Sequence, residues 1–94
     1  MKTPEEILEE NGYSIYDLEE AETILFRDPD YATAIIGVST NYEVIYDYDK
    51  MIEYLVDNEN MTYDEAADFV SYNTIRATSY IQGNRPIIMY PFIE

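Results

Sequence analysis

The chain has 94 residues and a formal net charge of −15, from 5 Lys and Arg against 20 Asp and Glu. It contains no Cys and no His, which excludes disulfides, cysteine nucleophiles and the commonest general base and zinc ligand. Because 47 % of the residues are apolar, the charge belongs to a chain that can fold, and the length predicts one small domain, residues 1–94.

Charge and hydropathy also indicate a location and a class of partner. The first residues are acidic and lack the apolar core of a signal peptide. No stretch reaches the roughly 18 apolar residues of a transmembrane helix. We therefore expect a cytoplasmic protein that binds no membrane. Its negative charge predicts repulsion of nucleic acid, hence no direct nucleic-acid binding, and attraction to basic proteins.

The first 22 residues predict a helical N-terminal arm. Thr3-Pro4-Glu5-Glu6 has the pattern of an N-cap, a proline at the first helical position and a capping box, and Asn11-Gly12 ends that helix. Ser14 opens a second short helix that is expected to run to about residue 22. The remaining residues, 23–94, form the body of the domain.

The middle of the chain predicts strands. Residues 23–26 are β-branched or aromatic in composition and favour a strand over a last helical turn. Residues 32–38 and 42–46 flank Ser39-Thr40-Asn41, which is typical of a hairpin. Gly37, inside the first of these strands, indicates a β-bulge or a close contact.

Two further helices are expected after the hairpin. Residues 49–58 carry an apolar stripe at helical spacing, with Asp47 or Asp49 as N-cap. The stripe consists of Tyr48, Met51, Ile52, Leu55 and Val56. Thr62-Tyr63-Asp64-Glu65 is a second capping box, and Asn73 on the apolar side of that helix is expected to cap its end or to tie down residues 74–76.

A closing strand is predicted at residues 86–90, which could pair with an earlier strand. The elements together predict an α+β fold. In it, a small antiparallel sheet, made of the hairpin and the C-terminal strand, packs against two helices and follows a helical N-terminal arm.

The carboxylates recur every four residues along the predicted helices, so they share helix faces. These residues are Glu5, Glu6, Glu9, Glu10, Asp49, Glu53, Asp57, Asp64 and Asp68. Like charges at this spacing destabilise a helix by about 0.2–0.5 kcal/mol per pair. Two interpretations stay open. The rows imitate a phosphate backbone and bind a basic protein, or they are solvated faces that keep a small domain soluble.

Other residue patterns are explained better by structural roles, such as turns, N-caps and ion pairs, than by metal binding or catalysis. Asp28-Pro29-Asp30 and Asp47-Tyr48-Asp49 lack the Gly and distal Glu of a calcium loop, so turns and N-caps explain them better. Arg76 and Arg85 are expected to pair with carboxylates; the alternative is that they are the only cationic contact points for an anion. No nucleophile elbow, P-loop or dinucleotide motif is present. We therefore expect a non-enzyme with no catalytic, cofactor or metal site.

The 11 tyrosines allow two interpretations as well. They sit at the edge of the core with the hydroxyl in water, or some of them form an aromatic patch beside the acids. The residues concerned are Tyr48, Tyr54, Tyr63, Tyr72, Tyr80 and Tyr90.

Four short stretches carry a family resemblance: residues 34–38, 46–51, 61–66 and 72–77. They resemble small acidic hypothetical proteins of gut bacteria and their phages and prophages, across about residues 24–90. That group has no assigned activity, so the resemblance implies a mobile-element origin and no role. Small acidic phage proteins include DNA mimics that block host defences, and this analogy favours the mimic interpretation.

The leading hypothesis is a non-enzymatic binding protein that sets its carboxylate rows against a basic partner, a nuclease or another DNA-handling protein, as a DNA mimic. The alternative is a structural phage accessory protein that forms a homo-oligomer through tyrosines and the strand around Ile87-Ile88-Met89, with no DNA mimicry.

Overall fold

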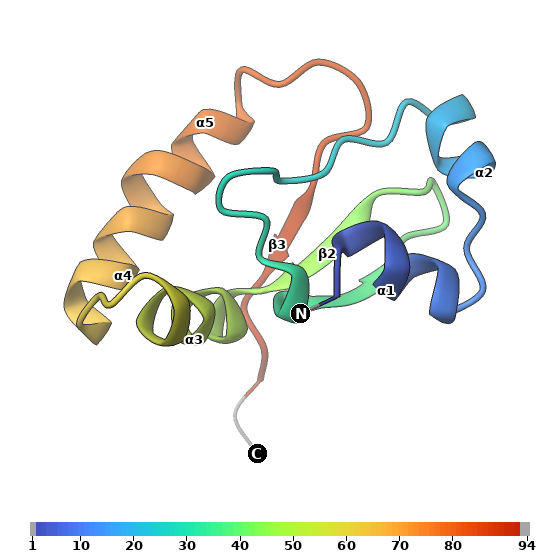
Figure 1. Ribbon diagram of the computed structural model, residues 1–94. Helices are drawn as coiled ribbons and strands as arrows, with labels where there is room; N and C mark the ends of the chain where they lie inside the picture. The colour runs from blue at the N-terminus through green and yellow to red at the C-terminus, as the bar shows by residue number, and fades with distance from the viewer. Residues whose placement is uncertain (1, 93–94) are drawn as a thin grey trace.

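The computed structural model describes residues 2–92, in which helices flank a three-stranded sheet (Figure 1). The sheet contains β1 (Ile35–Val38), β2 (Val44–Asp47) and β3 (Ile87–Met89), in the order β1-β2-β3. The helices are α1 (Pro4–Glu10), α2 (Ile15–Glu20), α3 (Tyr48–Asn58), α4 (Tyr63–Phe69) and α5 (Arg76–Thr78). A 3₁₀ turn, η1 (Ala32–Ala34), precedes β1, and a π-helical turn, η2 (Val70–Ile75), joins α4 to α5. The predicted α+β class is confirmed.

The N-terminal arm forms as its capping residues predict. Thr3 Oγ1 accepts a hydrogen bond from the Glu6 backbone N–H at 3.2 Å, and Glu6 Oε1 accepts one from the Thr3 N–H at 3.1 Å. Each helix contributes one buried leucine, Leu8 at 2 % exposed and Leu18 at 4 %. Both leucines belong to the same core cluster as the body, so the arm packs on the body.

The hairpin is confirmed, with a shorter first strand than expected. The predicted strand starts at residue 32, but η1 occupies its first three residues and leaves β1 with four. The register shifts between Ile35 and Gly37, which is the bulge that Gly37 indicated. Val44 and Tyr46 of β2 are fully buried and form the centre of the core.

The third strand pairs in the opposite sense to the prediction. β3 lies parallel to β2, with Ile45 opposite Ile87 and Tyr46 opposite Ile88, so the sheet is mixed and not antiparallel. The physical reason is the connection: α3, α4, η2 and α5 lie between β2 and β3, and a crossover of that length returns the chain in the same direction.

Residues 23–26 do not form the predicted strand. Thr23 makes one isolated bridge to Asn84, and the segment otherwise runs extended over the core with Leu25 and Phe26 half-buried. Both edges of β2 are already paired, with β1 and with β3. The apolar composition of this segment therefore reports burial and not a place in the sheet.

α3 confirms the helix predicted at residues 49–58, with one exception in its apolar stripe. Asp47 is the N-cap and accepts from the Lys50 N–H at 3.1 Å, while Met51, Ile52 and Leu55 are buried. Val56, the last member of the predicted stripe, is 37 % exposed. Successive residues turn about 100° round a helix, so Val56 lies at the margin of the buried face, beyond Ile52.

The helix that starts at Thr62 continues further than expected. The prediction that Asn73 caps its end is wrong: Asn73 is exposed, and the chain continues helically through η2 to Thr78. Within η2 the buried polar residue is Thr74, which follows Ala66 and Val70 on the inner face. A π-helical turn holds more residues than an α-helical turn, so it shifts the buried position along the chain.

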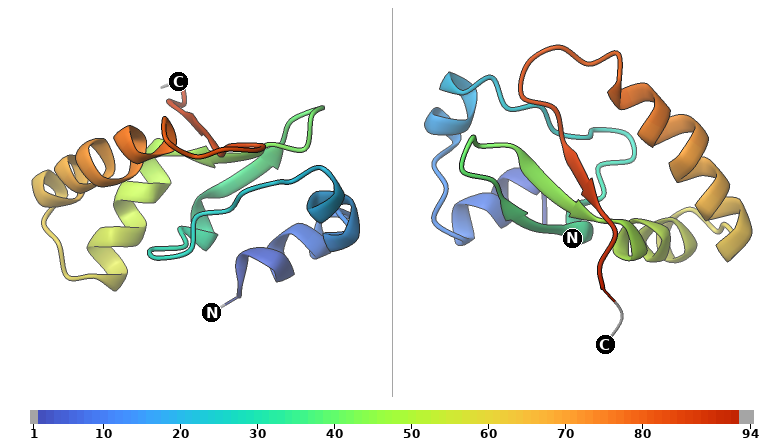
Figure 2. Two further views of the ribbon diagram at one scale, coloured as in Figure 1. Left: turned by 90° about the horizontal axis from the view of Figure 1, so that it is seen from above. Right: turned by 180° about the vertical axis from the view of Figure 1, so that it is seen from behind.

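The helices leave one face of the sheet uncovered. Seen from above, the arm lies on one side of the sheet. Seen from behind, no described helix lies in front of β2 and β3 (Figure 2). That face carries Met89, which is 37 % exposed, together with the half-buried Ile45 and Ile87, which pair across β2 and β3.

Candidate protein-binding surface

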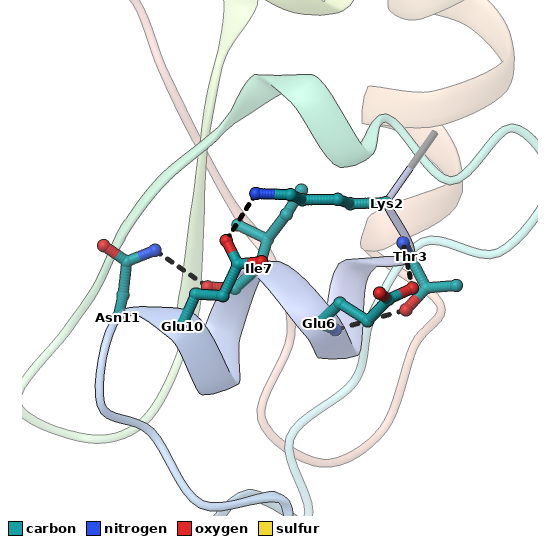
Figure 3. Close-up of polar contacts among 6 residues, drawn as sticks. All are labelled: Lys2, Thr3, Glu6, Ile7, Glu10 and Asn11. Carbon is teal, nitrogen blue, oxygen red and sulfur yellow. Dashed lines mark hydrogen bonds and ion pairs between the residues drawn. The ribbon is translucent and has the colours of Figure 1, made fainter.

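The carboxylates of α1 are largely engaged within the chain. Glu10 pairs with Lys2 Nζ at 2.7 Å, and Glu6 caps the helix through the Thr3 N–H (Figure 3). Glu5 pairs with Arg27 Nη1 at 2.6 Å. Glu9 is the exposed member of this row without such a contact among the described residues. Most of this row therefore stabilises the arm.

These contacts set the ionisation of the groups that make them. The hydrogen bond to Glu10 raises the pKa of Lys2, and the Thr3 backbone N–H lowers the pKa of Glu6. Burial acts to raise the pKa of Glu5, but the hydrogen bond and charge of Arg27 outweigh it, so that pKa is lowered. The lysine and both carboxyl groups are therefore charged at neutral pH.

The carboxylates of α3 are not engaged in this way. Asp49, Glu53 and Asp57 are exposed and lie four residues apart, opposite the face that buries Met51 and Leu55. No described basic side chain forms an ion pair with them. This row is a line of charge that the described part of the chain does not neutralise.

The row on α4 borders a shallow hollow of about 370 Å³. Asp64 and Asp68 are exposed, opposite the buried Ala66, and form no ion pair among residues 2–92. The hollow is lined by Met61, Glu65, Asp68, Phe69, Tyr72 and Asn73. Carboxylates next to an aromatic ring are the surroundings that a Lys or Arg side chain prefers.

The few basic residues do not neutralise these rows. Arg76 stacks over the Tyr72 ring at 5.9 Å, and Arg85 donates to the Thr78 carbonyl at 3.4 Å. The expectation that both arginines pair with carboxylates is wrong within the described residues. Arg76 lies on the same helical run as Asp68 but stacks on Tyr72 instead.

A second group of acids was not predicted as part of the surface. Burial raises the pKa of the Tyr54 hydroxyl first, and neighbouring negative charges raise it further. Those charges belong to Asp28, Asp30 and Glu59. Asp30 also accepts from the Ala32 N–H at 3.0 Å, which is the turn role that its sequence context indicates. Only the tertiary fold brings this loop to the end of α3.

The tyrosines divide between the two interpretations. Tyr48 and Tyr54 are half-buried at the edge of the core, as the first interpretation expects. Tyr63, Tyr72, Tyr80 and Tyr90 are each more than 60 % exposed, so core-edge packing is wrong for these four. Tyr63 and Tyr72 lie on the helix that carries Asp64 and Asp68, which places aromatic rings beside acids.

Among residues 2–92, no cluster of three acidic side chains has a geometry that could hold a metal ion. No described helix has the length and apolar character needed to cross a membrane. No protein-family model, curated protein or solved structure matches the chain.

Proposed function

We propose that the protein is a non-enzymatic binding protein that docks a basic partner against the acidic helices α3 and α4. One observation carries the proposal. Five exposed carboxylates on these two helices have no ion-pair partner among the described residues: Asp49, Glu53, Asp57, Asp64 and Asp68. The row on α1, by contrast, is mostly engaged within the chain.

Electrostatics supports this role. Carboxylates at four-residue spacing repel one another, and a Lys or Arg brought between them relieves that repulsion. α3 and α4 pack against each other, so a partner that reaches one row lies close to the other. The hollow beside Asp68 offers the ring of Phe69 to a cationic side chain, while Arg76 of this chain already lies over the Tyr72 ring.

The partner class follows from the same chemistry. A rigid set of carboxylates resembles a phosphate backbone to a groove lined with Lys and Arg. The proposed partner is therefore a nuclease or another DNA-handling protein, whose groove this protein occupies as a DNA mimic. The mimic itself binds no nucleic acid, because the net charge of −15 repels it.

The test is a calorimetric titration against a panel of basic nucleic-acid-binding proteins at two salt concentrations. Binding should weaken by about tenfold or more between about 0.05 M and about 0.3 M salt, because exposed charges are screened. Neutralising the row by D49N, E53Q and D57N should weaken it by a similar factor.

A matched control keeps the change in total charge constant. The triple variant D17N, E20Q and E22Q removes three exposed carboxylates from α2 and the turn after it, and should bind almost as tightly as the wild type. Added duplex DNA should compete with the protein. Equal losses in the two triple variants, or binding that ignores salt and DNA, would contradict the proposal.

A second candidate function is supported by the uncovered face of the sheet. Ile45, Ile87 and Met89 form an apolar surface there, and a self-assembling accessory protein needs such a surface. Sedimentation at high salt distinguishes the two functions. A homo-oligomer that persists at about 0.5 M salt, and dissociates in the variant I87T, would favour this candidate.

A further inference from the structure

A groove runs between α1 and the free edge of β1. β1 is an edge strand, paired with β2 on one side only. The groove, about 290 Å³ in volume, takes Ile7, Leu8, Asn11 and Tyr13 from the arm as one wall. Its other wall is the whole of β1, Ile35–Val38.

The lining shows that the groove follows the edge of the strand and not one of its faces. Successive side chains of a strand point to opposite faces, so a cavity on one face is lined by alternate residues. Here four consecutive residues line it. A Cβ built on Gly37 meets no atom within 4 Å, so there is room for a side chain at this residue of the lining.

An edge strand presents a row of backbone N–H and C=O groups that another extended chain can pair with. Natural edges are blocked by charged side chains, by Pro or by a covering element. β1 has no charged residue and no Pro, and its sequence is Ile35-Ile36-Gly37-Val38. The bulge turns Ile36 outward, where it is 41 % exposed and lines the groove.

The acidic side chains near the groove indicate that a basic chain would bind there. No basic residue lines it. The next depression along the arm shares Tyr13 with the groove and carries Glu9 and Glu19, and Glu43 lies at the hairpin end of β1. A second copy of this chain, with its net charge of −15, would be repelled from this rim.

We infer that the groove between α1 and β1 binds an extended basic segment of the partner, which pairs with β1 as a fourth strand and sets apolar side chains against Ile7 and Ile36. The inference rests on the function proposed above. It adds the mode of recognition: strand addition on the arm side, with the acidic helices engaging the rest of the partner.

The probe is a synthetic eight-residue peptide of alternating valine and lysine, titrated into the ¹⁵N-labelled protein and followed by NMR and calorimetry. Amide shifts should concentrate in α1 and β1. A peptide with N-methylated backbone amides has the same charge but cannot pair as a strand, and it should bind at least about tenfold more weakly. A valine–glutamate peptide should not bind.

The variant Gly37→Val adds a β-branched side chain to a residue that lines the groove, and it does so without straining the fold, because the position is open and the backbone there is not left-handed. It should keep the wild-type melting temperature and bind the basic peptide at least about tenfold more weakly. The variant with D49N, E53Q and D57N should bind the peptide within about threefold of the wild type, since α3 does not line the groove.

Each outcome separates this inference from the proposed function. Peptide binding that is unaffected by N-methylation or by Gly37→Val, or shifts centred on α3 and α4, overturns strand addition. In that case, salt-sensitive binding of a basic protein through α3 would still support the proposed function. If the peptide binds in the groove but no basic protein binds through α3, the groove stands and the proposed function fails.

Discussion

At the scale of single residues, the core depends on one buried pair of hydroxyls. Tyr31 is fully buried with a left-handed backbone, at φ 48°, and its hydroxyl lies 2.8 Å from Thr74 Oγ1. Thr74 reaches that position because η2 places it on the inner face of the helix. A buried hydroxyl without a partner is costly, so each residue of the pair satisfies the other.

A double-mutant cycle tests this pair. Thr74→Val leaves the Tyr31 hydroxyl buried and unpaired, and Tyr31→Phe does the same to Thr74, so each should lower the free energy of unfolding by about 1–3 kcal/mol. The double variant leaves neither hydroxyl and should cost no more than one single variant. Urea unfolding measures all four proteins, and strictly additive losses would contradict the pairing.

The Tyr46 hydroxyl provides a second residue-scale prediction, at alkaline pH. Burial raises its pKa to about 12, although it also accepts a hydrogen bond from the Phe26 N–H. In the unfolded chain Tyr46 ionises near pH 10, whereas in the folded chain it stays neutral up to about 12. Its contribution to stability is therefore present below pH 10 and is lost as pH rises to about 12.

The measurement compares the wild type with Tyr46→Phe by urea unfolding at a series of alkaline pH values. Other tyrosines titrate in both proteins, so the difference between them isolates Tyr46. The wild type should lose its unfolding free energy more steeply than the variant above pH 10. Parallel curves would mean that Tyr46 ionises freely in the folded protein.

At the scale of elements, capping motifs predict helix starts from a few neighbouring residues, whereas strand pairing and helix ends depend on the tertiary fold. The capping boxes at Thr3 and Thr62 lie within four consecutive residues, so sequence alone predicts both helix starts. The parallel pairing of β3 depends on how the intervening helices return the chain, which no local pattern encodes. The shift from Asn73 to Thr74 comes from η2, which a regular helical period cannot anticipate.

The second capping box predicts a pH dependence that belongs to α4. The backbone N–H of Thr62 donates to Glu65 Oε1 at 2.9 Å and lowers the pKa of that carboxyl below its ordinary value of about 4.5. A lowered folded pKa gives a contribution to stability that is present above about pH 4.5 and is lost as pH falls through the folded pKa.

Glu65→Gln keeps an oxygen acceptor for Thr62 and removes the ionisation. Chemical unfolding between pH 3 and about 6 should therefore show a steeper acid loss in the wild type than in the variant. Thr62→Ala removes the cap itself and should cost about 1 kcal/mol at neutral pH, which checks that the box stabilises the helix. Identical acid profiles for wild type and Glu65→Gln would rule out the pH effect.

At the scale of the whole molecule, the sequence predicts which acids share a helix but not which of them are free. Four-residue spacing identifies each row, whereas the partners of Glu5 and Glu10 come from Arg27 and Lys2 in other segments. The groove beside β1 cannot be predicted from the sequence either, because more than 20 residues separate its two walls along the chain. Only the tertiary structure shows that the carboxylates of α1 are mostly engaged and that those of α3 and α4 have no ion pair among residues 2–92.

Unrelieved repulsion on α3 should make the molecule less stable than its core allows. Glu53 repels both Asp49 and Asp57, and Asp57 also lies at the C-terminal end of the helix, where the dipole disfavours negative charge. The double variant E53Q and D57N should therefore raise the free energy of unfolding by roughly 0.5–1 kcal/mol at low salt. Asp49 is excluded because it lies in the first turn, where a negative charge is favourable.

Thermal melts at about 0.02 M and about 0.5 M sodium chloride test whether this gain is electrostatic. The wild type should gain stability with salt, and the advantage of the double variant should shrink, because salt screens the repulsion that the substitutions remove. Asp17→Asn, in the first turn of α2, is the matched control and should lower stability.

If the double variant melts higher yet loses a basic partner that the wild type binds, the row is kept for binding at the expense of stability. An advantage that persists at high salt would instead mean that the substitutions act through helix propensity and that the row carries no strain for a partner to relieve.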